Sequence, residues 1–400
     1  MKKYLTESID LIYEAKSNFP ESVDFLYREA HLYHAISIYL QDNGISPVSY
    51  LRKVINIYTE IIDKFSNSSD IGLAIFDRGV NRFYLAWNLY IFEGKNPHNI
   101  LGQAISDFKT RLKIDGKNLS SFLGLINAYL FKVNFLLWNG GNIEENLKQL
   151  DNWIENANTL HPVYSLFYYF RFDLCFRKVI FHKMFRTDPS KNFKECEAII
   201  KSYKKLFKKR GYYNDFNGRL KLLRCYLDVE RYGRLSNVKN GYFEFLKNYL
   251  KRVKKGEEDL NGELFPLFLY MEKNNISYNK EVVSDLEYVI SELKDCSTKS
   301  ILTDRELAIS LLYLAACYER TGDKKKPIKS LELADTFLKK YNYNLLEVRF
   351  LKSIIQYAEG YDVKKNREFL KNLLKENRFY RMYFGNLIRY YLKNHVVLSQ

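Results

Sequence analysis

The stretch that decides the fold is ILTDRELAISLLYLAACYERTGDKKKPIKSLELADTFLKK, residues 301–340. Apolar or small residues recur there at helical intervals on both sides of Gly322, namely Leu311, Leu314, Ala315, Tyr318, Leu331 and Ala334. This spacing predicts two helices joined by a turn at Gly322. A single helix pair cannot bury its own apolar face, so it needs further pairs on either side. The segment therefore predicts an all-α solenoid of stacked helix pairs.

The spacing resembles the tetratricopeptide repeat, in which small and large residues interlock between paired antiparallel helices. A second stretch is similar: a turn at 115–118 lies between two such sets, Ala104, Phe108 and Leu112 before it and Leu125, Ala128 and Tyr129 after it. The resemblance implies a right-handed superhelix of about eight antiparallel pairs, whose first helices line a concave groove. In that register the groove positions include Leu123, Asn127, Leu312, Ala316 and Glu319.

The repeats are longer than those of the family. Apolar periodicity between breaks places the starts of the first helices near residues 21, 70, 118, 162, 216, 259, 303 and 344. The intervals run from 41 to 54 residues, against about 34 in tetratricopeptide repeats and about 40 to 47 in HEAT-like arrays. We therefore expect a divergent repeat protein with one domain over 1–400. A capping helix is expected in 1–20, helix pairs over 21–376 and a second capping helix in 377–400.

Three helix starts carry a side-chain signal of their own. Ser46, Asn96 and Asp188 each stand directly before a proline. An oxygen-bearing side chain followed by proline is typical of a helix N-terminus, because the side chain accepts a backbone N–H and proline has none to lose. Each of the three is predicted to cap the helix that follows it.

Composition supports a large helical core. The chain has 400 residues, of which 46% are hydrophobic and 16% aromatic, so it is not expected to be disordered. Only 7 prolines and 18 glycines are present, and they leave too few breaks for a β-sandwich or a parallel sheet.

The cysteines and the N-terminus bear on the cellular compartment. Five widely spaced cysteines contain no CxxC pair and are expected to be buried thiols: Cys175, Cys196, Cys225, Cys296 and Cys317. Glu7, Asp10 and Glu14 interrupt what would be the apolar core of a secretory signal. We therefore expect a cytoplasmic protein.

Residues 119–138 form the most hydrophobic run, with a single charge at Lys132, and they are long enough to cross a bilayer. The same run holds the repeat-like Leu125, Ala128 and Tyr129, and it also contains polar residues. A buried repeat helix is therefore favoured, and no membrane span is expected.

The positive charge is concentrated in one part of the chain. Residues 201–255 hold 17 Lys or Arg and four acids, a net charge of +13, while the whole chain has +16. Within 192–209 the apolar residues form one helical stripe, and lysines occupy the opposite side. The predicted basic ridge consists of Lys201, Lys204, Lys205, Lys208, Lys209, Arg210, Arg219, Lys221 and Arg224. Such a ridge can attract phosphate backbones, acidic protein tails or anionic lipid.

No motif for an enzyme or a cofactor is found. The sequence has no GxxxxGK followed by Ser or Thr, no HExxH and no GxSxG. His31 and His34 can share one side of a helix, but a third metal ligand would have to come from elsewhere. Asp173, Cys175, and Cys196 with His182 show no spacing that favours a nucleophile and its base. We expect no catalysis, no cofactor and no metal.

Two functional interpretations stay open beside the simplest one, in which the ridge is only a solvated helix face. The first is a non-catalytic scaffold or adaptor that binds a protein or peptide segment in its groove, at Asn127 and Glu319 among others, with the ridge favouring an acidic partner. The second is an RNA-binding repeat protein that uses the ridge at 201–255. Interleaved tyrosines suit base stacking there: Tyr203, Tyr212, Tyr213, Tyr226 and Tyr232. The oligomeric state is not predicted.

Overall fold

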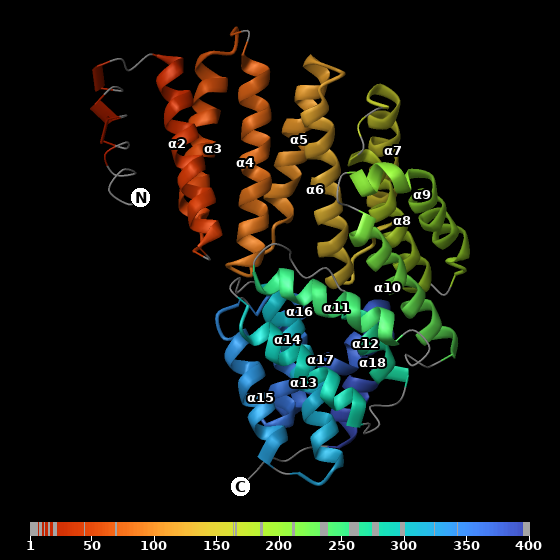
Figure 1. Ribbon diagram of the computed structural model, residues 1–400. Helices are drawn as coiled ribbons and strands as arrows, with labels where there is room; N and C mark the ends of the chain where they lie inside the picture. The colour runs from red at the N-terminus through yellow and green to blue at the C-terminus, as the bar shows by residue number, and fades with distance from the viewer. Residues whose placement is uncertain are drawn as a thin grey trace. The chain divides into compact units, whose positions relative to one another are not determined.

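A computed structural model describes residues 22–394 except 44, 69, 163, 165, 185–186, 210–212, 233–238, 256–263, 274–279, 297–300, 324 and 342, together with 7, 10, 11, 13, 14, 17 and 18. Within these residues the regular structure is α-helical, with no β-strand. Seventeen helices, α2 to α18, follow one another in the described part (Figure 1). The predicted all-α class is confirmed.

In chain order the described helices can be grouped as eight successive couples followed by one final helix. The pairs are α2 (Val23–Asp42) with α3 (Val48–Lys64), α4 (Ile71–Ile91) with α5 (His98–Ile114), α6 (Leu119–Trp138) with α7 (Glu144–Leu160), α8 (Leu166–Met184) with α9 (Ser190–Lys209), α10 (Tyr213–Tyr232) with α11 (Lys239–Lys254), α12 (Phe265–Lys273) with α13 (Lys280–Lys294), α14 (Ile301–Arg320) with α15 (Lys325–Leu338), and α16 (Leu346–Ala358) with α17 (Val363–Glu376). The final helix is α18 (Arg378–Lys393). Each first helix begins within six residues of its predicted start.

Polar contacts between first helices of successive pairs show the same repeat length. His34 Nδ1 of α2 lies 2.8 Å from Asn81 Oδ1 of α4, and Asn88 Nδ2 donates to Gln41 Oε1 at 3.0 Å. In each of these two pairs the residues are 47 positions apart in the sequence. Arg305 of α14 donates to Glu347 of α16, 42 residues later. Because each side chain reaches the equivalent helix one repeat away, the repeat is longer than the family standard, as predicted.

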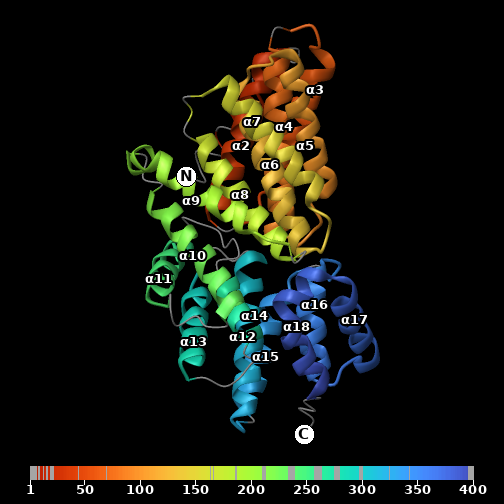
Figure 2. The same cartoon turned by 90° about the vertical axis from the view of Figure 1, so that its right-hand side faces the viewer.

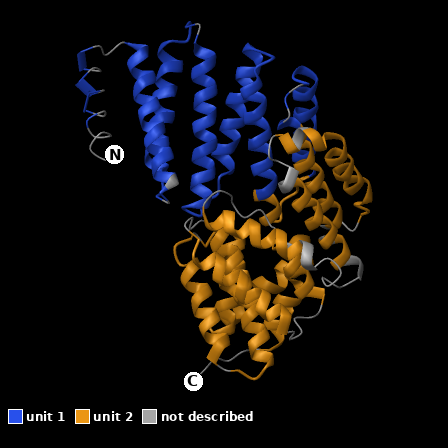
Figure 3. Ribbon diagram, in the orientation of Figure 1, with its two compact units in different colours: residues 1–134, 144–167 blue, residues 135–143, 168–400 orange. Residues whose placement is uncertain are grey.

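The described residues divide into two compact units, coloured separately in Figure 3. The first comprises residues 1–134 and 144–167. Its helices α2 to α5 run side by side in both Figure 1 and Figure 2. A small residue also allows α6 to approach α5 closely, since a Cβ on Gly124 of α6 would lie 2.6 Å from the ring of Phe108 on α5. The residues that carry the tetratricopeptide resemblance in this unit are core residues, because Ala104, Phe108, Leu125 and Ala128 are all buried.

The second unit comprises residues 135–143 and 168–400, and α14 lies at its centre. Every residue from Ile301 to Cys317 is buried. The helix pair predicted for 301–340 is confirmed, since α14 packs on α15 and Gly322 has a φ of +79° in the turn between them. The final helix α18 packs against α12, α16 and α17. It therefore contributes to the core of this unit and does more than cover one end, as a capping helix would.

Several smaller predictions have distinct outcomes. Asn96 Oδ1 accepts the N–H of His98, and Asp188 Oδ1 accepts that of Ser190, so both cap their helices. The Ser46 hydroxyl instead donates to Glu93, so that predicted cap is wrong. The capping helix predicted in 1–20 lies largely outside the described residues. The single domain over 1–400 stays a prediction.

Among the described helices, only α6 is long and apolar enough to cross a membrane, and 56% of its most hydrophobic window is buried. This amount of burial is typical of a core helix, which meets the same criteria of length and composition.

Candidate functional site

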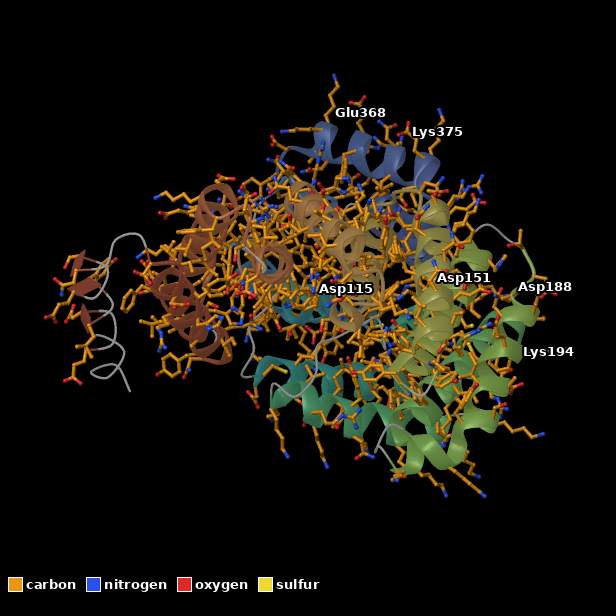
Figure 4. All side chains as sticks on the ribbon, turned by 90° about the horizontal axis from the view of Figure 1, so that it is seen from above. Asp115, Asp151, Asp188, Lys194, Glu368 and Lys375 are labelled. Atoms are coloured by element: carbon orange, nitrogen blue, oxygen red, sulfur yellow. The ribbon has the colours of Figure 1, made fainter. Side chains whose placement is uncertain are left out.

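The basic ridge is built on α9. The helix begins after Asp188, whose Oδ1 accepts the N–H and the hydroxyl of Ser190 at 2.9 and 2.6 Å. Cys196, Ile199 and Ile200 bury one face of the helix, as the predicted stripe requires. The other face carries the lysines, and all five on this helix are exposed: Lys201, Lys204, Lys205, Lys208 and Lys209. Lys194 and Asp188 mark the beginning of the helix in Figure 4.

A kink interrupts α9 in the middle of the ridge. Tyr203 has φ −107° and ψ 16°, outside the helical range. Its ring stacks on that of Tyr168 from α8, with ring centroids 3.8 Å apart and planes 24° from parallel. Both tyrosines are half-buried, and burial together with their mutual hydrogen bond raises the pKa of the Tyr203 hydroxyl. A stacked aromatic pair therefore lies directly beside Lys204.

Arg219 does not belong to the ridge, which corrects the prediction. It is only 8% exposed, and it donates to Asp173 Oδ1 of α8 at 3.3 Å. Arg177 pairs with the same carboxylate at 2.8 Å. Asp173 thus bridges two buried guanidinium groups, and Arg219 has a structural role between α8 and α10.

The remaining residues of the predicted ridge differ in their exposure to solvent and in their ion pairs. Lys221 is exposed on α10. Arg224 is exposed as well, but it pairs with Glu197 of α9. Arg210 lies outside the described residues. The exposed ridge therefore consists of the five lysines of α9, together with Lys221 on α10.

Lysine is the only cation of the ridge on α9, and this limits the recognition that the helix can offer. The five ammonium groups are spread over nine residues, about 12 Å along a helix axis. A lysine acts as a mobile point charge and lacks the fixed fork with which arginine reads a carboxylate or a base edge. The α9 ridge suits an extended polyanion that is bound through its charge.

The predicted groove positions on α14 are covered by the chain itself. The Tyr391 hydroxyl of α18 donates to the carbonyl of Leu312 at 2.9 Å, and that of Tyr390 to the carbonyl of Ala316 at 3.3 Å. Tyr390 also donates to Glu319. Leu312 and Ala316 are fully buried. They therefore do not line an open groove, because α18 occupies that face. On α6, Asn127 is exposed and Leu123 is half-buried.

The polar groups considered for catalysis are engaged elsewhere. Contact with Cys175 and burial raise the pKa of the Cys196 thiol, which disfavours the nucleophilic thiolate. His182 Nδ1 lies 2.7 Å from the hydroxyl of Thr187. In the first unit, His31 and His34 interact with Asp77 of α4. The described part of the chain contains no group of three or more His, Cys, Asp or Glu placed to hold a metal.

Sequence reasoning named Tyr168 only as one ring of an aromatic cluster and did not assign it to the ridge. It stands among the aromatic residues of 164–176, where nothing distinguishes it from a core residue. Its stacking partner is 35 residues away, and helical periodicity relates only residues that are three or four apart. The signal that was available was Tyr203 itself, an aromatic residue between two lysine clusters.

No protein-family model matches the chain, and no curated protein matches it. Among solved structures, a human IFIT1 dimer with m7Gppp-AAAA is 14% identical, with 100% of this chain and 87% of that chain covered and a TM-score of 0.45. A monomeric IFIT1 mutant with Gppp-AAAA is 15% identical, with 98% and 86% covered and a TM-score of 0.35. These values describe a distant likeness, and the fold given above rests on the chain's own helices.

Proposed function

We propose that this chain is a helical-repeat protein that binds single-stranded RNA along α9. The observation that carries the proposal is the combination of five exposed lysines with the half-buried stacked pair Tyr168 and Tyr203. Proteins that bind single strands without sequence preference combine a positive surface with aromatic rings on which bases stack. Lysines without arginine forks fit contacts to phosphates better than contacts to base edges.

An acidic protein segment is the second candidate ligand. The charge of the ridge favours it equally, and exposed Asn127 on α6 can still hydrogen-bond a peptide backbone. The part of this interpretation that placed a peptide against α14 loses support, because α18 covers Leu312 and Ala316. The acidic segment would need no stacking surface, which separates the two candidates experimentally.

The first experiment compares two variants that lose the same charge at different places. The ridge variant carries Lys201→Gln, Lys205→Gln and Lys209→Gln and so loses three charges of the ridge. The α17 variant carries Lys364→Gln, Lys371→Gln and Lys375→Gln and loses three charges from exposed positions of α17. We expect the ridge variant to bind a labelled single-stranded RNA at least tenfold more weakly, and to lower the slope of log affinity against log salt by about 2, as three lost phosphate contacts predict. The α17 variant should keep the affinity within about twofold. Equal losses in both variants would contradict the proposal.

The second experiment uses the unaltered protein and tests for stacking. An abasic oligonucleotide of the same length retains the phosphates but has no bases. Because stacking of a base on an aromatic side chain contributes about 1 to 3 kcal/mol, we expect the abasic strand to bind roughly 5- to 150-fold more weakly. If the abasic strand and a poly-glutamate peptide bind as tightly as RNA, charge alone decides the binding and the acidic protein segment is the better candidate.

A cytoplasmic location is part of the same proposal. The five cysteines are all buried thiols with no disulfide among them. This supports a reducing compartment, where free thiols persist.

A further inference from the structure

One lysine on α6 is less exposed to solvent than an ordinary surface lysine. Lys132 is the single charged residue of 119–138, and it is half-buried. Burial lowers the pKa of its ammonium group, and the positive charge of Lys109 lowers it further. Within the part of the chain that the structure describes, no carboxylate forms an ion pair with either lysine. Two positive charges therefore lie near each other where solvent is partly excluded.

Aromatic rings from two helices hold the second lysine in position. Lys109 of α5 places its Nζ 5.8 Å from the ring centroid of Tyr129 on α6 and 5.9 Å from that of Trp153 on α7. Cations are attracted to the faces of such rings at this distance. Tyr129 stands three residues before Lys132, so the two share one side of α6. Helices α5, α6 and α7 thus bring two ammonium groups and two rings together.

The one acidic residue of α5 already forms two ion pairs. Asp107 accepts from Arg78 at 2.8 Å and from Arg82 at 2.7 Å, both on α4. Its charge is outnumbered there by two guanidinium groups, so it does not offset the lysines. Placing unpaired like charges at a partly buried position destabilises a fold, and a bound anion removes that cost.

We propose that Lys109 and Lys132 form a binding site for an oxyanion group, a phosphate or a carboxylate, flanked by the rings of Tyr129 and Trp153. Two point-charge donors suit an anion whose oxygen atoms are spread over a few ångströms. The site lies in the first unit and uses no residue of the ridge on α9, so it is independent of the RNA binding proposed for that helix.

The test titrates inorganic phosphate, with sodium chloride adjusted to hold the ionic strength constant, and follows thermal unfolding and tryptophan fluorescence. Lys132→Met and Lys109→Met remove one charge each and keep the side-chain length. The control is Lys113→Met, an exposed lysine one turn further along α5. We expect a saturable rise in Tm for the unaltered protein and the control. We expect about tenfold weaker phosphate binding, or none, in the other two.

A second measurement distinguishes loss of the anion site from misfolding of the variant. Without phosphate, Lys132→Met should raise Tm, because it removes a half-buried charge and its repulsion from Lys109. The chain has three tryptophans. A Trp153→Phe variant should lose the fluorescence response while it keeps the phosphate-dependent rise in Tm.

The outcomes separate cleanly. A saturable response to acetate with none to phosphate supports the site and assigns it to carboxylates, and the reverse assigns it to phosphates. No saturable response to either anion, or the same response in Lys109→Met, Lys132→Met and Lys113→Met, would overturn the proposal. Neither result depends on whether RNA binds to α9.

Discussion

Two glycines with positive φ lie in very different surroundings. Gly140 has φ +69°, and a Cβ added to it would lie 1.8 Å from Nδ2 of Asn377. The Oδ1 of Asn377 accepts the N–H groups of Phe379 and Tyr380 and so begins α18. Gly322 has φ +79° and nothing within 4 Å of the same position. Of these two glycines, Gly140 alone combines a left-handed backbone with a close approach to the residue that caps another helix.

We expect Gly322→Ala to cost about 1 to 2 kcal/mol, the cost of a left-handed conformation for a residue with a Cβ. Gly140→Ala should cost at least about 1 kcal/mol more, because the new methyl group displaces the cap of α18. Urea denaturation of both variants measures the difference. Equal losses of stability would show that Asn377 moves aside without weakening α18.

Glu272 is a carboxylate at the end of α12 that is buried inside the second unit. It accepts N–H groups of Asn386 and Leu387 in α18, and the hydroxyl of Tyr313 donates to it at 2.8 Å. Burial nevertheless raises its pKa from 4.5 to about 7, against these bonds and the charge of Arg389. Between these two values the folded chain binds the proton more tightly than the unfolded chain. The free energy of unfolding therefore decreases as pH rises through this range.

The decrease due to Glu272 is about 3 kcal/mol between pH of about 4.5 and 7. Glu272→Gln cannot titrate, so we expect the variant to lose this part of the slope, although its amide group also places a donor against a backbone N–H. Denaturation at several pH values, compared between the two proteins, isolates the contribution because all other titrating groups are shared. Parallel curves would rule out Glu272 as the source.

At the scale of the helix, periodicity predicted α9 well and α14 only in part. The buried face of α9 at Cys196, Ile199 and Ile200 follows from spacing alone. In α14 the charged Arg305 is only 1% exposed. Glu306 and Glu347 accept hydrogen bonds from its guanidinium group, and the centroid of the Trp138 ring lies 3.4 Å from its Cζ. Two of these partners are distant in the sequence, so local spacing assigns the residue to solvent. Arg219 was misassigned for the same reason, since its partner Asp173 lies 46 residues earlier.

The helix α18 gives a prediction at the same scale. A terminal cap can be removed with little more than fraying, but α18 buries nine residues, among them Phe384, Tyr390 and Tyr391. A chain that ends at Glu376 should therefore expose the apolar surface of α12 and α14, bind a hydrophobic dye and lose cooperative unfolding of the second unit. The control is a chain that ends at Asn394, which should unfold as the full chain does. A cooperative transition without α18 would restore its interpretation as a simple cap.

For the whole molecule, the sequence was sufficient to place the helices but not to show how they close on one another. Starts of first helices were predicted to within a few residues because Gly, Pro and capping side chains mark them locally. The covering of α14 by α18 depends on hydrogen bonds such as that from Tyr391 to Leu312, 79 residues apart, and no periodic pattern encodes such a pair. The same limit explains the candidate site: its lysines were predicted, whereas the stack of Tyr203 on Tyr168 was not.

The uneven charge of the whole molecule leads to a final prediction. Of the net +16, residues 201–255 carry +13, while α17 mixes its lysines with Glu368 and Glu376. Glu368 and Lys375 of this helix are labelled in Figure 4. Like charges on the ridge repel over about 30 Å at 0.01 M salt and about 8 Å at 0.15 M. We therefore expect the Tm of the ligand-free chain to rise when sodium chloride is increased over this range.

The variant with Lys201→Gln, Lys205→Gln and Lys209→Gln should have a higher Tm at low salt and a weaker dependence of Tm on salt. The variant with Lys364→Gln, Lys371→Gln and Lys375→Gln should do so less, although the change in net charge is the same, because Glu368 and Glu376 partly offset the positive charge of α17. Differential scanning calorimetry at the two salt concentrations measures both effects. If the two variants respond alike, the repulsion belongs to the net charge and not to the ridge, and the stability of the free protein would then give no reason for α9 to attract a polyanion.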